Sequence, residues 1–125
     1  MMLVLDAGAL IAWERRAGTV EARLTAAWRN DEDVHVPTAV VAQAWRDGRA
    51  QVSLAKLLAA VIVVPVDEGL ARRAGELLAR TGTSDAVDAI VACLAAKHGA
   101  TIVTSDPGDL QRLADDLGGV RVLSV

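Results

Sequence analysis

The sequence contains no Phe or Tyr, a single cysteine, three prolines and no apolar run long enough to cross a membrane. The lone Cys93 excludes an intramolecular disulfide, and its apolar surroundings predict a reduced, buried thiol. A membrane-spanning helix needs about 20 apolar residues, and no signal peptide precedes the first apolar segment. We therefore expect a cytoplasmic protein with no membrane partner. With three Trp as the only large aromatic residues, the core is expected to be aliphatic.

The composition is that of a globular domain with a small excess of acid. The 125 residues are 53% apolar and 23% charged, which fits one domain over residues 1–125 and excludes a disordered chain. The formal net charge of −3 gives no positive support for nucleic-acid binding. Five aspartates at the ends of apolar runs account for this excess. The acidic balance therefore does not exclude a substrate that carries phosphate.

Apolar patterning predicts strands that alternate with helices. We expect strands at Met2–Leu5, Val34–Val36, Val61–Val64, Thr101–Thr104 and Val120–Leu123. We expect helices at Ala9–Arg16, Thr19–Arg29, Ala39–Arg46, Gln51–Ala60, Asp67–Thr81, Ser84–His98 and Pro107–Leu117. Because the strands read as continuous apolar runs, this alternation predicts an α/β fold whose parallel sheet is covered on both faces.

The five aspartates are Asp6, Asp85, Asp88, Asp106 and Asp109. Asp6 and Asp106 follow strands, at the carboxyl edge where parallel sheets bind ligands. Asp85 and Asp88 open the longest apolar helix, so the carboxylates are expected to gather. Like charges a few ångströms apart repel by roughly 4 kcal/mol per pair near a surface. A hard divalent cation such as Mg²⁺ or Mn²⁺ is the usual way to offset such repulsion.

Each carboxylate also has a purely structural interpretation. Asp6 and Asp106 are natural N-caps, with Thr38 as a third, and Asp106 with Asp109 resembles a capping box. Asp85 could serve the dipole of the helix that it opens.

Asp88 is the hardest of the five to explain structurally. Its neighbours one turn on are apolar, and an unpaired buried charge is strongly disfavoured. An ion pair with Arg72 or Arg73 is the structural alternative.

Four motifs follow one another along the chain. They are Met-Leu-Val-Leu-Asp6-Ala-Gly-Ala-Leu-Ile-Ala, Val-Pro-Thr-Ala-Val-Val-Ala-Gln43-Ala-Trp-Arg, Asp85-Ala-Val-Asp88-Ala-Ile-Val-Ala-Cys-Leu-Ala and Ile-Val-Thr-Ser-Asp106-Pro-Gly-Asp109-Leu. In this order they resemble a PIN domain, and specifically the VapC-type ribonuclease toxins of bacterial type II toxin–antitoxin pairs. The resemblance covers the whole chain.

This resemblance implies a three-layer α/β/α sandwich with a central parallel sheet, a homodimer and a cognate antitoxin partner. It also implies that the protein cleaves RNA by means of water activated by Mg²⁺ or Mn²⁺. Asp6, Asp88 and Asp106 fall on the family's acidic positions, as metal ligands and catalytic residues. By the same comparison Asp85 is a further catalytic candidate and Asp109 an accessory acid.

Position 43 departs from the family pattern, which has Glu there. Gln43 keeps a carbonyl oxygen that could ligate a metal or a bound water, but it adds no negative charge. Two functions therefore stay open: a metal-dependent endoribonuclease, or a catalytically weakened PIN-like binding or regulatory module. A phosphatase of the haloacid dehalogenase type is disfavoured, because it needs a second Asp where Gly8 stands.

RNA would be gripped mainly through its phosphates, which requires cations. Arginines that follow the first two motifs could border the binding groove, although helical arginines are more often solvated surface. Trp13 and Trp45 could stack on bases, but packing against the core is the stronger expectation. The candidate arginines are Arg15, Arg16, Arg46 and Arg49.

No residue has the surroundings of a covalent nucleophile. Ser84, Ser105 and Cys93 have no partnered His nearby in the sequence. His35 and His98 lack metal-site spacing and are expected at the surface or at a strand end.

Overall fold

The computed structural model describes all 125 residues and contains five strands and seven helices. The strands are β1 (Met2–Leu5), β2 (Asp33–Pro37), β3 (Ile62–Val64), β4 (Thr101–Thr104) and β5 (Arg121–Ser124). The helices are α1 (Ala7–Glu14), α2 (Gly18–Arg29), α3 (Thr38–Ala44), α4 (Val52–Ala60), α5 (Glu68–Thr81), α6 (Ala86–His98) and α7 (Gly108–Asp116). Every predicted element is present, with its ends displaced by at most two residues. No helix combines the length and the apolar character needed to span a membrane.

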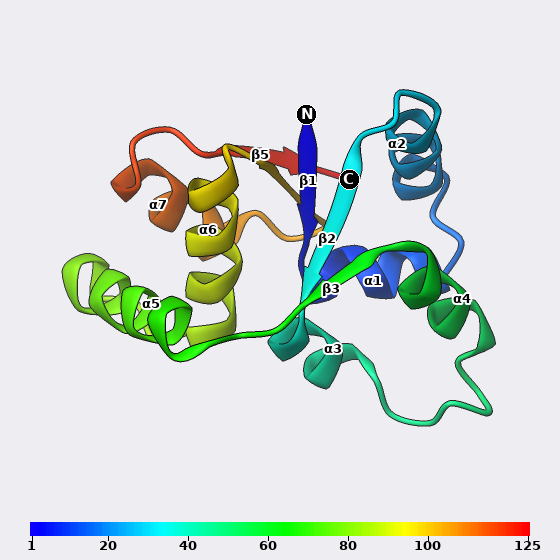
Figure 1. The fold of residues 1–125 in the computed structure, drawn as a ribbon, viewed down its shortest axis with the longest axis horizontal. Coiled ribbons are helices and arrows are strands. Elements are labelled where there is room, and N and C mark those ends of the chain that lie inside the picture. Colours follow the sequence, from blue (N-terminus) through cyan, green and yellow to red (C-terminus); the bar gives the residue numbers. More distant parts are fainter.

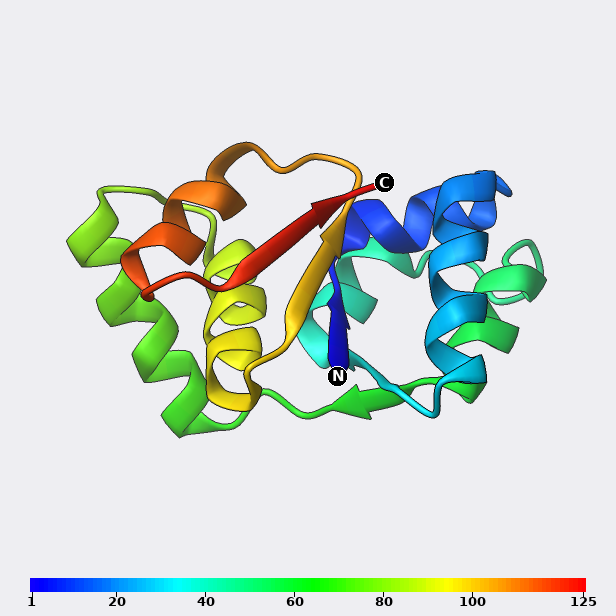
Figure 2. The same cartoon turned by 90° about the horizontal axis from the view of Figure 1, so that it is seen from above.

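All five strands are parallel and form one sheet in the order β3-β2-β1-β4-β5. Parallel neighbours need crossover connections, and the helices supply them. Helices α1, α2 and α4 lie on one side of the sheet, and α5, α6 and α7 lie on the other (Figures 1 and 2). Helix α3 follows the end of β2 and contacts both α1 and α6. The predicted three-layer α/β/α sandwich is confirmed.

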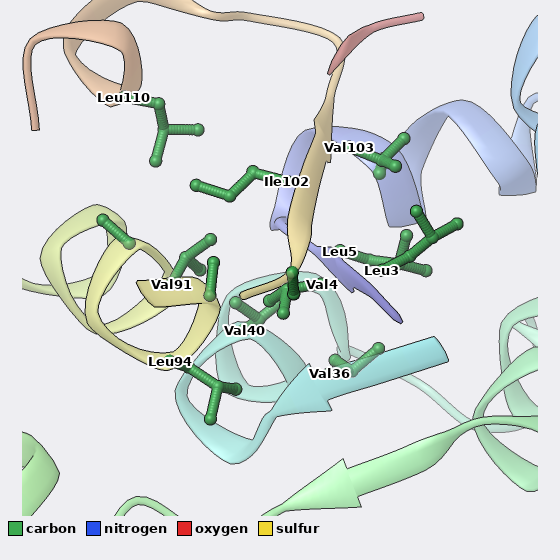
Figure 3. Packing of buried hydrophobic residues seen from close by; sticks show 14 of the residues in the cluster. Leu3, Val4, Leu5, Val36, Val40, Val91, Leu94, Ile102, Val103 and Leu110 are labelled. Carbon is green, nitrogen blue, oxygen red and sulfur yellow. The ribbon is translucent and has the colours of Figure 1, made fainter. Parts of the chain in front are cut away.

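The core is aliphatic, as expected, and the central strand β1 contributes to both of its layers. Val4 and Ile102 are register partners, and both point toward α6, where Val91 lies (Figure 3). Leu3 and Leu5 point to the opposite side, because alternate side chains of a strand face opposite ways. All five side chains are completely buried.

The three tryptophans pack against this core. Trp13 and Trp28 meet edge to face, with 6.0 Å between their ring centroids. Trp13, Trp28 and Trp45 are partly buried against the main hydrophobic cluster, which confirms the packing role expected for Trp13 and Trp45.

Two expectations about single residues are wrong. His35 is 8% exposed rather than at the surface, because β2 lies between β1 and β3 and both of its faces are covered. Thr38 does not cap α3: Pro37 occupies the N-cap position, and the Thr38 hydroxyl accepts a hydrogen bond from the Val66 N–H at 3.2 Å.

Helix α3 ends at Ala44, two residues earlier than predicted. Beyond this point the Gln51 side chain supplies the hydrogen-bond partners that a further helical turn would have used. Gln51 Nε2 donates to the Ala44 carbonyl at 2.8 Å. Its Oε1 accepts from the N–H groups of Arg46 at 2.6 Å and Asp47 at 2.9 Å. The Gln51 side chain, from beyond the end of the helix, thus satisfies the backbone groups at the end of α3.

Candidate active site

The chain reverses its direction across the sheet between β1 and β4. Helix α1 leaves β1 toward one face, and α7 leaves β4 toward the other (Figure 2). Open α/β sheets bind ligands at such a switch point. Asp6 directly follows β1, and its N–H donates to the Val103 carbonyl of β4 at 3.3 Å. Asp106 comes two residues after β4, so both aspartates lie at the switch point.

Asp6 is buried, with 7% exposure, and both of its carboxylate oxygens accept hydrogen bonds. Oδ1 accepts from the Ala9 N–H at 2.9 Å, which confirms Asp6 as the N-cap of α1. Oδ2 accepts from the Thr104 hydroxyl at 2.5 Å. Burial raises the pKa of Asp6 and so does the charge of Asp106, while the bonds from Thr104 and Ala9 lower it. Asp6 is therefore fixed in place by its neighbours.

Thr104 is a functional candidate that the sequence analysis missed. Its side chain is fully buried, and its hydroxyl oxygen accepts the Asp106 N–H at 3.0 Å while it donates to Asp6. One hydroxyl thus ties both strand ends together. A polar residue closing an apolar strand directly before Ser105 and Asp106 was the only signal in the sequence.

Asp85 and Asp88 occupy the start of α6. Asp85 is the N-cap, because its Oδ1 accepts the Asp88 N–H at 3.0 Å. The Asp88 side chain is partly buried. Its carboxylate accepts no hydrogen bond, unlike the carboxylates of Asp6 and Asp85. Loss of hydration is the first cause that raises the pKa of Asp88 to about 6, followed by the charges of Asp85, Asp6, Asp109 and Asp106. These five residues therefore share one electrostatic environment, which we call the acidic edge.

No cationic side chain offsets the acidic edge. None of the ion pairs in the structure involves its five aspartates. Arg72 pairs instead with Glu68 at 3.1 Å, and the charges that shift the pKa of Asp88 are all negative. The suggestion that Arg72 or Arg73 forms an ion pair with Asp88 is therefore wrong.

Asp106 and Asp109 are not explained by helix capping. Helix α7 begins at Gly108, its N-cap position is Pro107, and no side chain caps it. The capping-box interpretation of these two residues is therefore wrong, and both side chains are exposed.

A comparison with known protein families matches residues 3–116 to the PIN domain. The chain belongs to the PIN domain family. This confirms the resemblance inferred from the four motifs. A comparison with curated proteins finds no significant match.

Solved structures show the same fold over nearly the whole chain. VapBC2 from Rickettsia felis, bound to a DNA fragment from its promoter, has a TM-score of 0.77 at 17% identity, covering 100% of this chain and 99% of that one. DNA-bound VapBC from Salmonella typhimurium has a TM-score of 0.75 at 17% identity, covering 99% and 98%. FitAcB from Neisseria gonorrhoeae has a TM-score of 0.67 at 24% identity, covering 98% and 97%. At these identities the likeness concerns the fold.

In this PIN domain, the loop that carries Asp106 lies directly on the first turn of α1. A Cβ atom at Gly8 would be 2.5 Å from Ser105 Oγ and 3.3 Å from both Ser105 N and Asp6 Oδ1. A side chain at position 8 would therefore have to displace the Ser105 hydroxyl and crowd the Ser105 backbone, so glycine suits the close approach of the two strand ends. There is no room for the second Asp of a haloacid dehalogenase-type phosphatase.

The structure does not join Gln43 to the acidic edge by a hydrogen bond. Gln43 is exposed one residue before the end of α3, and the bonds of the five carboxylates come from Ala9, Thr104 and Asp88. A role for Gln43 in metal binding stays a prediction.

The four candidate arginines are exposed. The Arg46 guanidinium folds back and donates to the carbonyls of Ala42 at 3.1 Å and Trp45 at 2.7 Å. Arg15, Arg16 and Arg49 make no ion pair within this chain.

The donor set of the acidic edge suits a hard divalent cation. All of its side chains offer carboxylate oxygens, and loss of hydration, followed by their mutual repulsion, raises the pKa of Asp88. As the side chains stand, no group of three His, Cys, Asp or Glu residues is placed to hold a metal ion. Binding of an ion here would therefore require these side chains to move closer together or waters to complete the coordination, as is usual for Mg²⁺.

Proposed function

We propose that this PIN domain is a metal-dependent endoribonuclease and the toxin of a type II toxin–antitoxin pair. The observation that carries the proposal is Asp88. Loss of hydration and the charges of four other aspartates raise its pKa to about 6, and no ion pair of the chain offsets the charge. Perturbed pKa values at the carboxyl edge of a sheet favour a functional site over a structural one.

Asp6, Asp88 and Asp106 would hold Mg²⁺ or Mn²⁺, directly or through water. A bound ion lowers the pKa of a coordinated water and stabilises negative charge on phosphoryl oxygens. Hydrogen bonds fix Asp6 on both oxygens, so it would orient the site. Asp85 uses only Oδ1 to cap α6, which leaves Oδ2 to accept a proton or orient the attacking water, and Asp109 is the other candidate.

The partners follow from the same charge pattern. RNA would bind through its phosphates, with Arg15, Arg16, Arg46 and Arg49 as candidate contacts. A cognate antitoxin would inhibit by placing a basic side chain against the acidic edge, where none of this chain's own cations lies. VapBC-5 from Mycobacterium tuberculosis, a solved structure of similar fold, is described as a member of the VapBC family of toxin–antitoxin systems. A homodimer and a cytoplasmic location stay predictions.

The test is cleavage of structured RNA by the purified chain in Mg²⁺, Mn²⁺ or EDTA. Wild type should cleave with either metal and not with EDTA. Asp88→Asn should lose on the order of 100-fold or more in rate, as expected for removing a metal ligand that stabilises transition-state charge. Asp115→Asn is the matched control, since Asp115 is an exposed aspartate outside the acidic edge. Cleavage in EDTA, or full activity of Asp88→Asn, would overturn the proposal.

Toxicity is tested separately by expression in bacteria. Wild type should arrest growth and Asp88→Asn should not. Growth unaffected by active wild-type enzyme would remove the toxin role while leaving the nuclease in place.

The second candidate function is a binding or regulatory module, and Gln43 favours it because it removes one negative charge from the family's acidic set. If wild type is inactive and Gln43→Glu cleaves RNA, the module is the better description. Cleavage by wild type excludes it.

A further inference from the structure

A second charged region lies away from the acidic edge, in a cavity of about 410 Å³ between α5, α6 and the end of α7. Three cationic side chains line it: Arg73 and Arg80 from α5, and Lys97 from the last turn of α6. None of the five aspartates of the acidic edge lines it. We call this region the cationic cavity.

Three apolar residues also line the cationic cavity: Cys93, which is 6% exposed, Ala96 and Leu117. We call these three residues its apolar floor. Burial raises the pKa of the Cys93 thiol, while the charges of Arg73 and Arg80 lower it. Both guanidinium groups are therefore close enough to Cys93 for their fields to reach the floor.

Two of the three cations are free. Arg80 Nε pairs with Asp116 Oδ2 at 3.1 Å, at the side of the cavity. Arg73 and Lys97 make no ion pair, although Glu76 also lines the cavity. Two unpaired cations from two helices, set over an apolar floor, are suited to a ligand with an anionic group and an apolar body.

We propose that the cationic cavity binds a phosphorylated small molecule of mononucleotide size. The phosphate lies between Arg73 and Lys97, and the apolar face of the ligand rests on Cys93 and Leu117. The cavity volume falls within the range of about 300–1,000 Å³ that is typical of small-molecule sites. The proposal does not depend on the nuclease function, because no residue of the acidic edge takes part.

The experiment is calorimetric titration of the whole chain with AMP and with inorganic phosphate, in EDTA so that no metal bridges the nucleotide to the acidic edge. AMP should bind with a dissociation constant below about 1 mM. The double variant Arg73→Gln, Lys97→Gln should bind at least about tenfold more weakly, since it loses two charge-assisted contacts. Arg72→Gln is the matched control, because Arg72 lies on the same helix but pairs with Glu68 outside the cavity.

Cys93 supplies a second measurement specific to this cavity, since it is the only cysteine of the chain. AMP should slow the reaction of Cys93 with a thiol reagent in wild type, and it should have no effect in the double variant. Unfolding curves of both variants check that they are folded.

Three results would overturn the proposal. The first is that wild type fails to bind AMP. The second is equal binding by the double variant, including the case in which Asp88→Asn abolishes it and so places the nucleotide at the acidic edge. The third is inorganic phosphate binding as tightly as AMP, which would remove the role of the apolar floor.

Discussion

Helix α6 joins two regions of opposite charge that are held in place in different ways. At its start, the acidic edge is fixed by hydrogen bonds: both oxygens of Asp6 are occupied, and Asp85 caps the helix. At its other end, the cationic cavity presents Lys97 and Arg73 without ion pairs. The helix dipole favours acids at the start and cations at the end, so it stabilises Asp85 and Lys97 alike.

This comparison separates structural charge from functional charge. Capping and the dipole give Asp85 a structural reason for its position, and the dipole gives one to Lys97, in addition to the roles proposed for both residues. Asp88 also lies in the first turn of α6, where the dipole favours an acid, but its pKa is raised all the same, so the fold as a whole disfavours its ionised form. A carboxylate whose ionised form lowers the stability of the fold is expected at a site where a bound cation compensates for its charge.

The largest effect should come from Thr104, the hydroxyl that ties the acidic edge together. Thr104→Val keeps the shape but leaves the buried Asp6 Oδ2 and the Asp106 N–H without this partner. We expect about 2 kcal/mol less stability in urea unfolding, as for a lost hydrogen bond to a buried charge. Metal-dependent cleavage should also fall.

Two controls sharpen this result. Thr104→Ser keeps the hydroxyl and should recover most of the loss. Lys97→Gln, at the other end of α6, should change stability by no more than about 0.5 kcal/mol, as is usual for exposed positions. Equal losses of unfolding free energy for Thr104→Val and Lys97→Gln would mean that the Thr104 hydroxyl stabilises the fold no more than an exposed cation does.

Gly8 and Gly75 differ in the space available to an added Cβ atom. At Gly8 a Cβ would meet Ser105, so Gly8→Ala must move the Ser105 hydroxyl and press on the Ser105 backbone in the loop that carries Asp106. We expect a loss of about 1–2 kcal/mol, the usual effect of overpacking. Gly75 is an exposed residue of α5, and a Cβ atom at this position would have no other atom within 4 Å. Gly75→Ala should gain about 0.5–1 kcal/mol through helix propensity. A gain of stability at both positions in chemical unfolding would contradict the close approach at Gly8.

The smallest effect concerns the charge of Asp88 in metal-free protein. The folded pKa is about 6, above the ordinary value of 3.8. Below about pH 3 the carboxyl is protonated in both states and has no effect on stability. As the pH rises from the unfolded pKa toward the folded pKa, the Asp88 carboxyl ionises first in the unfolded chain, so the folded state loses stability. Above the folded pKa this loss of stability is complete and stays constant. Asp88→Asn removes that penalty.

In EDTA at pH 8, Asp88→Asn should be more stable than wild type by about 1 kcal/mol, because a half-exposed charge is screened by solvent. The difference should shrink toward zero below about pH 3, where the carboxyl is protonated in both states. A variant less stable than wild type at pH 8 would show that the Asp88 carboxylate has a partner that stabilises it.

The sequence was sufficient for much of the fold and for the positions of the aspartates. Continuous apolar strands closed by Asp6 and Asp106 predict a parallel sheet with acids at its carboxyl edge, since period and strand ends are local properties. What the sequence could not show depends on tertiary contacts. The bond from Thr104 to Asp6 follows from the register of β1 and β4, and the end of α3 depends on Gln51.

His35 shows the same limit for burial. Its strand is short in the sequence, but α2 and α6 both contact β2, and the His35 ring lies 5.6 Å from the ring of His98 in α6. Which helices pack on a strand depends on tertiary contacts and is not a local property of the sequence.

The most direct test of the acidic edge as a cation site is the pKa of the Asp88 carboxyl, followed by ¹³C NMR with and without Mg²⁺. Without metal the pKa should be about 6. With saturating Mg²⁺ it should fall by at least about one unit, because a nearby cation favours the ionised form. A pKa that stays near its metal-free value in Mg²⁺ and in Mn²⁺ would contradict the account.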